Sequence, residues 1–165
     1  MISFKKDLDM KKLNFLRAVL VMILLTVIYV AIFIMPEIAE GLALKYRDFS
    51  SYKNFFLIIV YISLVPVGLI IYSTFKLLNI IEKERKFDRK AIREFDIIKY
   101  SSAIGAFLYL VTLLLVIIKR VPISAAMISL LIAELGFLAL AMISSIIKKL
   151  YTLAVELKEE SDFII

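Results

Sequence analysis

The stretch that decides the fold runs from Leu13 to Met35 and reads LNFLRAVLVMILLTVIYVAIFIM. Only Asn14, Arg17 and Thr26 interrupt its apolar character. At a rise of about 1.5 Å per residue, it is long enough to cross a hydrocarbon core of about 30 Å. It is also longer than the apolar region of a signal peptide, and no small-residue cleavage site follows it. We therefore interpret it as a retained membrane span.

Three more long apolar stretches follow, and the predicted spans cover residues 13–35, 55–78, 97–118 and 123–147. Pro36 is predicted to end the first helix. The segment 37–54 mixes charges with aliphatic and aromatic residues, so we expect it to lie on the membrane surface. The sequence thus predicts a single domain, residues 1–165, folded as an all-α, up-down-up-down bundle of four transmembrane helices.

Composition supports a lipid bilayer as the surroundings of this chain. Hydrophobic residues make up 62% of it, with a mean hydropathy of +0.95, against about 45–50% apolar residues in soluble domains. Cysteine and histidine are both absent, which excludes thiol nucleophiles, zinc fingers and Ser-His-Asp triads. With no phosphate-binding loop either, we expect a protein that is not an enzyme and that uses no cofactor or metal.

The basic residues are distributed unequally between the two sides of the predicted bundle. The N-terminus, the middle loop and the C-terminus carry 16 Lys and Arg residues, whereas the other two loops carry 5. The positive-inside rule therefore places both termini in the cytoplasm of a cell membrane. Contact with anionic lipid accounts for the net charge of +6, and we expect no direct nucleic-acid binding.

The segment 76–99 carries the densest charge of the chain, and helical spacing of apolar residues continues through it. We therefore expect the second and third helices to extend into the cytoplasm as a hairpin, with Asp88 as the N-cap of the third. In one interpretation this hairpin docks a protein partner. In the other, its apolar residues only pack the two extensions together. The predicted docking residues are Phe87, Arg89, Lys90, Ile92, Arg93 and Phe95.

Two stretches carry a family resemblance. Residues 77–88 read LLNIIEKERKFD, and residues 154–165 read AVELKEESDFII. Both resemble the YoaS-like family of small bacterial four-span membrane proteins (domain of unknown function 2975), although Lys86 and Ser161 stand where the family often has proline and asparagine. Family members occur mostly in Gram-positive bacteria and have no assigned activity. Many are encoded beside a small helix-turn-helix regulator, so the resemblance implies a DNA-binding protein as a cytoplasmic partner.

Glu134 is the most informative single residue, because it lies near the middle of the fourth predicted span. A charged side chain there costs about 2.5–3.5 kcal/mol on insertion scales. One interpretation is functional, with Glu134 binding a proton or cation during transport or sensing. The other is structural, with a protonated carboxyl hydrogen-bonded to Tyr109 or Thr112 at a similar depth.

Small residues recur every four positions on the last two spans, as in Ser101-Gly105, Ser102-Ala106 and Ala125-Ser129-Ala133. Such spacing lets helix backbones approach closely, either inside the hairpin of spans three and four or in a homodimer. Arg17, Lys148 and Lys149 lie near span ends, where we expect them to snorkel toward the cytoplasmic headgroups.

Two function hypotheses follow. The leading one is a non-enzymatic accessory or regulatory membrane protein that binds a cytoplasmic partner, such as a helix-turn-helix regulator. The alternative is an oligomeric small transporter, channel or antimicrobial-peptide immunity protein that uses Glu134, since four spans are too few for an ordinary monomeric pore.

Overall fold

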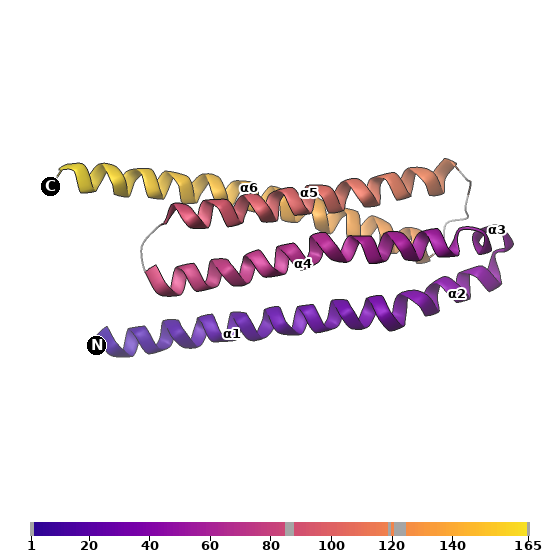
Figure 1. Ribbon diagram of the computed structural model, residues 1–165, viewed down its shortest axis with the longest axis horizontal. Coiled ribbons are helices and arrows are strands. Elements are labelled where there is room, and N and C mark those ends of the chain that lie inside the picture. Colours follow the sequence, from indigo (N-terminus) through magenta and orange to yellow (C-terminus); the bar gives the residue numbers. More distant parts are fainter. Residues whose placement is uncertain (1, 85–87, 119, 121–124, 165) are drawn as a thin grey trace.

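The computed structural model describes residues 2–84, 88–118, 120 and 125–164, and these are almost entirely helical. Helices of the four predicted spans run side by side along the long axis (Figure 1). Their bounds are α1 (Ile2–Tyr29), the π-helical segment η1 (Val30–Ile34), α2 (Met35–Lys45), α3 (Arg47–Ser50), α4 (Lys53–Glu84), α5 (Arg89–Ile118) and α6 (Ala125–Ile164).

Four helical stretches are long and apolar enough to cross a membrane, namely Lys6–Lys45, Lys53–Lys83, Arg89–Ile118 and Met127–Ile164. The four-span, all-α prediction is therefore confirmed. The predicted spans fall within these stretches, except that the fourth was predicted to begin at residue 123, outside the described residues.

Both termini lie at the same end of the bundle (Figure 1). We call this the basic end; it comprises the start of α1, the end of α4, the start of α5 and the C-terminal part of α6. The opposite end comprises α2, α3, the start of α4, the end of α5 and the start of α6. An up-down-up-down bundle of four helices has both termini at one end, so this arrangement agrees with the predicted topology.

The prediction that Pro36 ends the first helix was wrong. The helix passes through η1 into α2 and continues to Lys45. Pro36 occupies the first turn of α2, where its missing N–H costs little because the π-helical segment before it has already shifted the hydrogen-bond pattern. Residues 37–45 therefore extend the first helix, and the placement of segment 37–54 on the membrane surface stays a prediction.

A hydrophobic core holds the opposite end together. Buried Ala39 and Leu42 of α2 pack with Phe49 of α3 and Phe56 of α4. The rings of Phe49 and Phe56 meet edge to face, with centroids 5.9 Å apart. Farther along the first helix, packing becomes sparse, since only 6% of its most apolar 18-residue window is buried, against 39% for α5. The first helix is thus anchored at its ends and loosely packed between them.

Candidate functional site

Ion pairs at the basic end join each helix to its neighbour. Arg17 of α1 pairs with Glu82 of α4, and Lys76 of α4 pairs with Glu94 of α5 over 2.6 Å. Two pairs join α5 to α6: Asp96 with Lys148 over 2.5 Å, and Arg89 with Glu159 over 2.6 Å. Neighbouring apolar residues pack around buried Leu77, Ala91 and Ile98. Ion pairs and apolar packing therefore hold the end of α4, the start of α5 and the C-terminal part of α6 together as one unit, which we call the fastened basic end.

Two of these pairs involve basic residues near the span ends. Arg17 contacts Glu82 and also donates to the Asn79 side-chain oxygen over 2.7 Å. Lys148 contacts Asp96. Both cations therefore join neighbouring helices, a role that the sequence did not predict; that they also snorkel toward headgroups stays a prediction. The sequence could not reveal this, because the carboxylates lie 65 and 52 positions away in the chain.

Arg89 and Glu159 make a two-bond contact between α5 and α6. The Arg89 Nε donates to Glu159 Oε1 over 2.8 Å, and Nη2 donates to Oε2 over 2.6 Å. This hydrogen bonding, followed by the Arg89 charge, lowers the pKa of Glu159. The same hydrogen bond raises the pKa of Arg89. Both groups stay charged at neutral pH, so the contact keeps the C-terminal part of α6 beside α5.

The predicted docking residues separate into two groups. Arg89 serves the ion pair to α6, and the half-buried Phe95 ring lies 5.6 Å from the Tyr151 ring of α6. Lys90 and Arg93 have exposed side chains, whereas Ile92 is half-buried. Phe87 lies outside the described residues. In the described part of the hairpin, Phe95 therefore packs against α6, and the basic side chains of Lys90 and Arg93 point outward.

The N-cap prediction for α5 is confirmed. The backbone N–H of Lys90 donates to the Asp88 side-chain oxygen over 3.0 Å. The backbone N–H of Asp88 in turn donates to the Tyr151 hydroxyl over 2.9 Å. One aspartate thus starts the helix and contacts α6, which fixes where the α5 extension begins.

Glu94 is a buried charge that sequence reasoning did not single out within the charged segment 76–99. Its residue surface is 1% exposed. One carboxylate oxygen pairs with Lys76, and Oε2 is buried without a hydrogen-bond partner among the described residues. The signal that could have found it is periodicity, because Ala91, Glu94, Ile98 and Ser102 fall on one face of α5 and all are buried.

Glu134 is also buried, at 8% exposed, about 14 Å along α6 from its first residue. Its Oε2 has no hydrogen-bond partner in the described part of the chain. The donors proposed for it are engaged elsewhere: Thr112 donates to the Leu108 carbonyl oxygen over 2.8 Å, and the Tyr109 hydroxyl lies 3.1 Å from Ser63 Oγ. The structural interpretation through these two donors is therefore wrong.

The small residues of α5 serve close packing inside the monomer. Ser101, Ser102, Gly105 and Ala106 are all buried. Gly105 lies directly against the Phe137 ring of α6, and a Cβ added there would come within 2.5 Å of Phe137 Cε1. Glycine leaves room for the Phe137 ring at this position, and a larger residue would require that ring to move.

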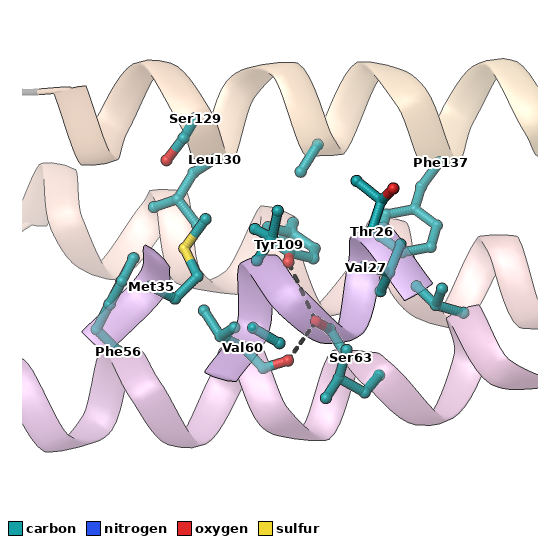
Figure 2. A pocket seen from close by; sticks show the side chains of 15 residues that line it. Thr26, Val27, Met35, Phe56, Val60, Ser63, Tyr109, Ser129, Leu130 and Phe137 are labelled. Carbon is teal, nitrogen blue, oxygen red and sulfur yellow. Dashed lines mark hydrogen bonds between the residues drawn. The ribbon is translucent and has the colours of Figure 1, made fainter. Parts of the chain in front are cut away.

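A cavity of about 290 Å³ lies between the loosely packed first helix and the other three (Figure 2). Its walls are mostly aliphatic and aromatic. The polar groups drawn around it include the Tyr109 hydroxyl and Ser63, which also donates to the Val60 carbonyl oxygen (Figure 2). Glu134 is not among its lining residues. The cavity suits an apolar guest and offers no charged group for catalysis.

Among the described residues, no group of three or more Asp, Glu, His or Cys side chains is placed so that it could hold a metal ion. Among the described residues, the buried carboxylates are Glu94 on α5, which pairs with Lys76, and Glu134 on α6. This arrangement can bind a proton or a single cation at Glu134, or present charged and apolar surfaces to a partner.

Comparison with known proteins identifies the family. Residues 37–165 match the family described as protein of unknown function (DUF2975). The chain belongs to this family. It is also 26% identical over 152 residues to the uncharacterized membrane protein YoaS of Bacillus subtilis (strain 168), covering 90% of this chain and 94% of that protein. The resemblance seen in residues 77–88 and 154–165 is confirmed. No solved structure matches this chain.

Proposed function

We propose that this family member is a multi-pass accessory protein of a bacterial cell membrane, without catalytic activity of its own, whose basic end lies in the cytoplasm and binds a protein partner. The observation that carries this proposal is the fastened basic end. Three helices continue past the charged belt formed by Lys76, Asp96 and Lys148, and ion pairs hold them in place.

The partner surface that best fits is the outer side of the α5 extension. Lys90 and Arg93 are exposed there, one helical turn apart, on a helix whose start is capped by Asp88. Such a rigid basic surface fits acidic side chains of a folded partner, because little side-chain and backbone order has to be created on binding. A small helix-turn-helix regulator, as the family resemblance implies, is the partner class that we propose.

The test is co-purification from native membranes. The variant Lys90→Glu/Arg93→Glu reverses the exposed charges without touching Arg89, whose removal would loosen α6. A matched control, Lys45→Glu/Arg47→Glu, makes the same charge change at exposed positions of the opposite end. We expect the control to recover the regulator at the wild-type level and the basic-end variant to lose it. Equal recovery by both variants would contradict the proposal.

A second candidate function rests on Glu134. A carboxyl group buried in the middle of a span, with one oxygen unpartnered, is the arrangement expected of a proton or cation site in a transporter, channel or immunity protein. Four spans would then require at least a dimer. Proton flux into proteoliposomes that vanishes for Glu134→Gln, but persists for the exposed control Glu156→Gln, would support this alternative. Identical flux in both variants would exclude it.

A further inference from the structure

The two sides of α6 differ in what they contact. One side faces α5, through buried Phe137, Ser144 and Val155 and half-buried Tyr151. The other side points away from this contact, and the C-terminal part of α6 lies at the edge of the bundle (Figure 1). At about 100° of rotation per residue, the outward side is centred nearly opposite to the contact with α5.

The outward side carries a continuous apolar line with a seven-residue repeat. Ile143, Ile146, Leu150, Leu153 and Leu157 follow one another at alternating separations of three and four residues. They are 52%, 58%, 62%, 48% and 66% exposed, respectively. Alternating three-four spacing is the pattern of a coiled-coil seam, in which one helix packs along another.

The same spacing continues into the membrane-spanning part of α6 as Ala139 and Gly136. A Cβ added to Gly136 would meet nothing within 4 Å, so this glycine is not needed for packing inside the monomer. Small residues on a membrane helix let a neighbouring helix approach closely. The line therefore offers close contact within the bilayer and larger aliphatic contact beyond it.

Lipid cannot cover the whole line. The neighbouring Lys148 and Lys149 mark the membrane boundary on α6. Leu153 and Leu157 lie about 6 and 12 Å beyond Lys149 along the helix axis. A row of leucines in water is unfavourable, and no described segment of the chain covers these two side chains, which stay about half or more exposed.

We propose that the line from Gly136 to Leu157 pairs with the same line of a second copy, as a parallel two-helix coiled coil that begins in the bilayer and ends in the cytoplasm. The occupant must cross the membrane boundary at the same depth and in the same direction as α6. A second copy does so automatically, because the bilayer fixes its orientation, and a two-fold axis along the membrane normal sets equal positions opposite each other.

Charge placement agrees with self-pairing. In a parallel coiled coil, the flanking Lys149 and Glu156 would face Ala154 and Ser161 of the second copy, so no like charges meet beside the line. The first residue that breaks the apolar line is Glu160. There, two glutamates would face each other, which sets the C-terminal limit of the contact. This pairing goes beyond the proposed partner binding and uses a different helix from Lys90 and Arg93.

The absence of cysteine makes crosslinking a direct test. Single cysteines would be placed at Leu150, Leu153 and Leu157 of the full chain, with two controls: Val155, which is buried on the opposite side of α6, and Ile81, an exposed aliphatic residue of α4 at the basic end. In native membranes, a short thiol crosslinker should give a species of twice the 18.9 kDa chain from the three line positions and little from the controls.

Crosslinking at Ile81 as strong as at the line positions would indicate random collision and overturn the proposal. So would a product of another mass, which would show that a different protein covers the line. A second measurement is the mass of the detergent-solubilised protein. Leu153→Glu should convert dimer to monomer, whereas Ile81→Glu should leave the dimer intact. A Leu153→Glu chain that stays dimeric with unchanged helical content would also overturn the proposal.

Discussion

Gly105→Ala tests how closely α5 and α6 pack in the middle of the bundle. The new methyl group would lie 2.5 Å from Phe137 Cε1, whereas carbon atoms in contact stay about 3.5–4.0 Å apart. The Phe137 ring, which is 8% exposed, would have to move by about 1 Å. It would thereby disturb its contact with the Tyr109 ring, whose centroid lies 5.6 Å away.

Overpacking of this kind costs about 1–3 kcal/mol. Phe137 also lines the cavity of about 290 Å³, so free volume lies beside the ring. We therefore expect the lower part of that range, about 1–2 kcal/mol of lost unfolding free energy. The assay is unfolding of the micelle-bound protein by increasing SDS, followed by circular dichroism of the helices.

Two comparisons make the result specific. Gly68→Ala and Gly41→Ala add a methyl group that meets nothing within 4 Å, so both should change stability little or slightly increase it. In a Phe137→Leu background, which removes part of the ring, Gly105→Ala should cost less than in the wild type. The reasoning would be refuted if Gly105→Ala were as stable as Gly68→Ala, or if its cost were the same with and without the Phe137 ring.

The remaining predictions concern ion pairs of the basic end. Lys76→Ala should lower the unfolding free energy by about 2–3 kcal/mol, near the lower limit for a broken buried pair, because Lys76 itself is half-exposed while Glu94 is not. The same SDS titration measures this loss of stability. The double variant Lys76→Ala/Glu94→Gln should recover part of the lost unfolding free energy. A Lys76→Ala chain as stable as the wild type would contradict the prediction. Because the pKa of Glu159 is lowered, its contact with Arg89 should be complete above the ordinary glutamate pKa of about 4.3 and should disappear as the pH falls through the lowered value. Hydrogen exchange around Val155, corrected for the intrinsic pH dependence, should then increase in acid for the wild type and be insensitive to pH in Glu159→Gln; matching profiles would refute this. The pKa of Arg89 is raised by the same hydrogen bond, so its guanidinium stays charged throughout the usable pH range and does not contribute to this pH dependence.

The four spans could be predicted because the bilayer imposes one strong requirement, a long apolar helix, that composition and length reveal directly. The start of α5 was predictable as well, since an Asp88 cap acts within one turn of the chain. Pro36 misled the prediction for a local reason. A proline normally ends a helix, and nothing in the letters of residues 30–34 indicates that a π-helical segment will accommodate it.

Contacts between distant segments were the part that sequence reasoning missed. Arg17 looks like a lipid-facing cation until α4 places Glu82 beside it. Glu94 looks like one of many solvated charges until α4 and α5 close over it. In both cases the decisive fact is which helix faces which. Periodicity identifies the buried face of α5, but it does not name the residue of α4 that will lie opposite.

The basic end of α6 shows why this distinction matters for function. When an amphipathic helix packs only against other helices of its own chain, its leucines face the neighbouring helix and its charged residues face water. Here the side of α6 toward α5 uses Tyr151, Val155 and an ion pair from Glu159, whereas Leu153 and Leu157 point outward. The contact with α5 is already complete without these leucines, so they are not spare core residues of the monomer. This row has coiled-coil spacing, and its last leucines lie beyond Lys149. These two features are the basis of the proposed pairing with a second copy, which the membrane would hold parallel and at equal depth.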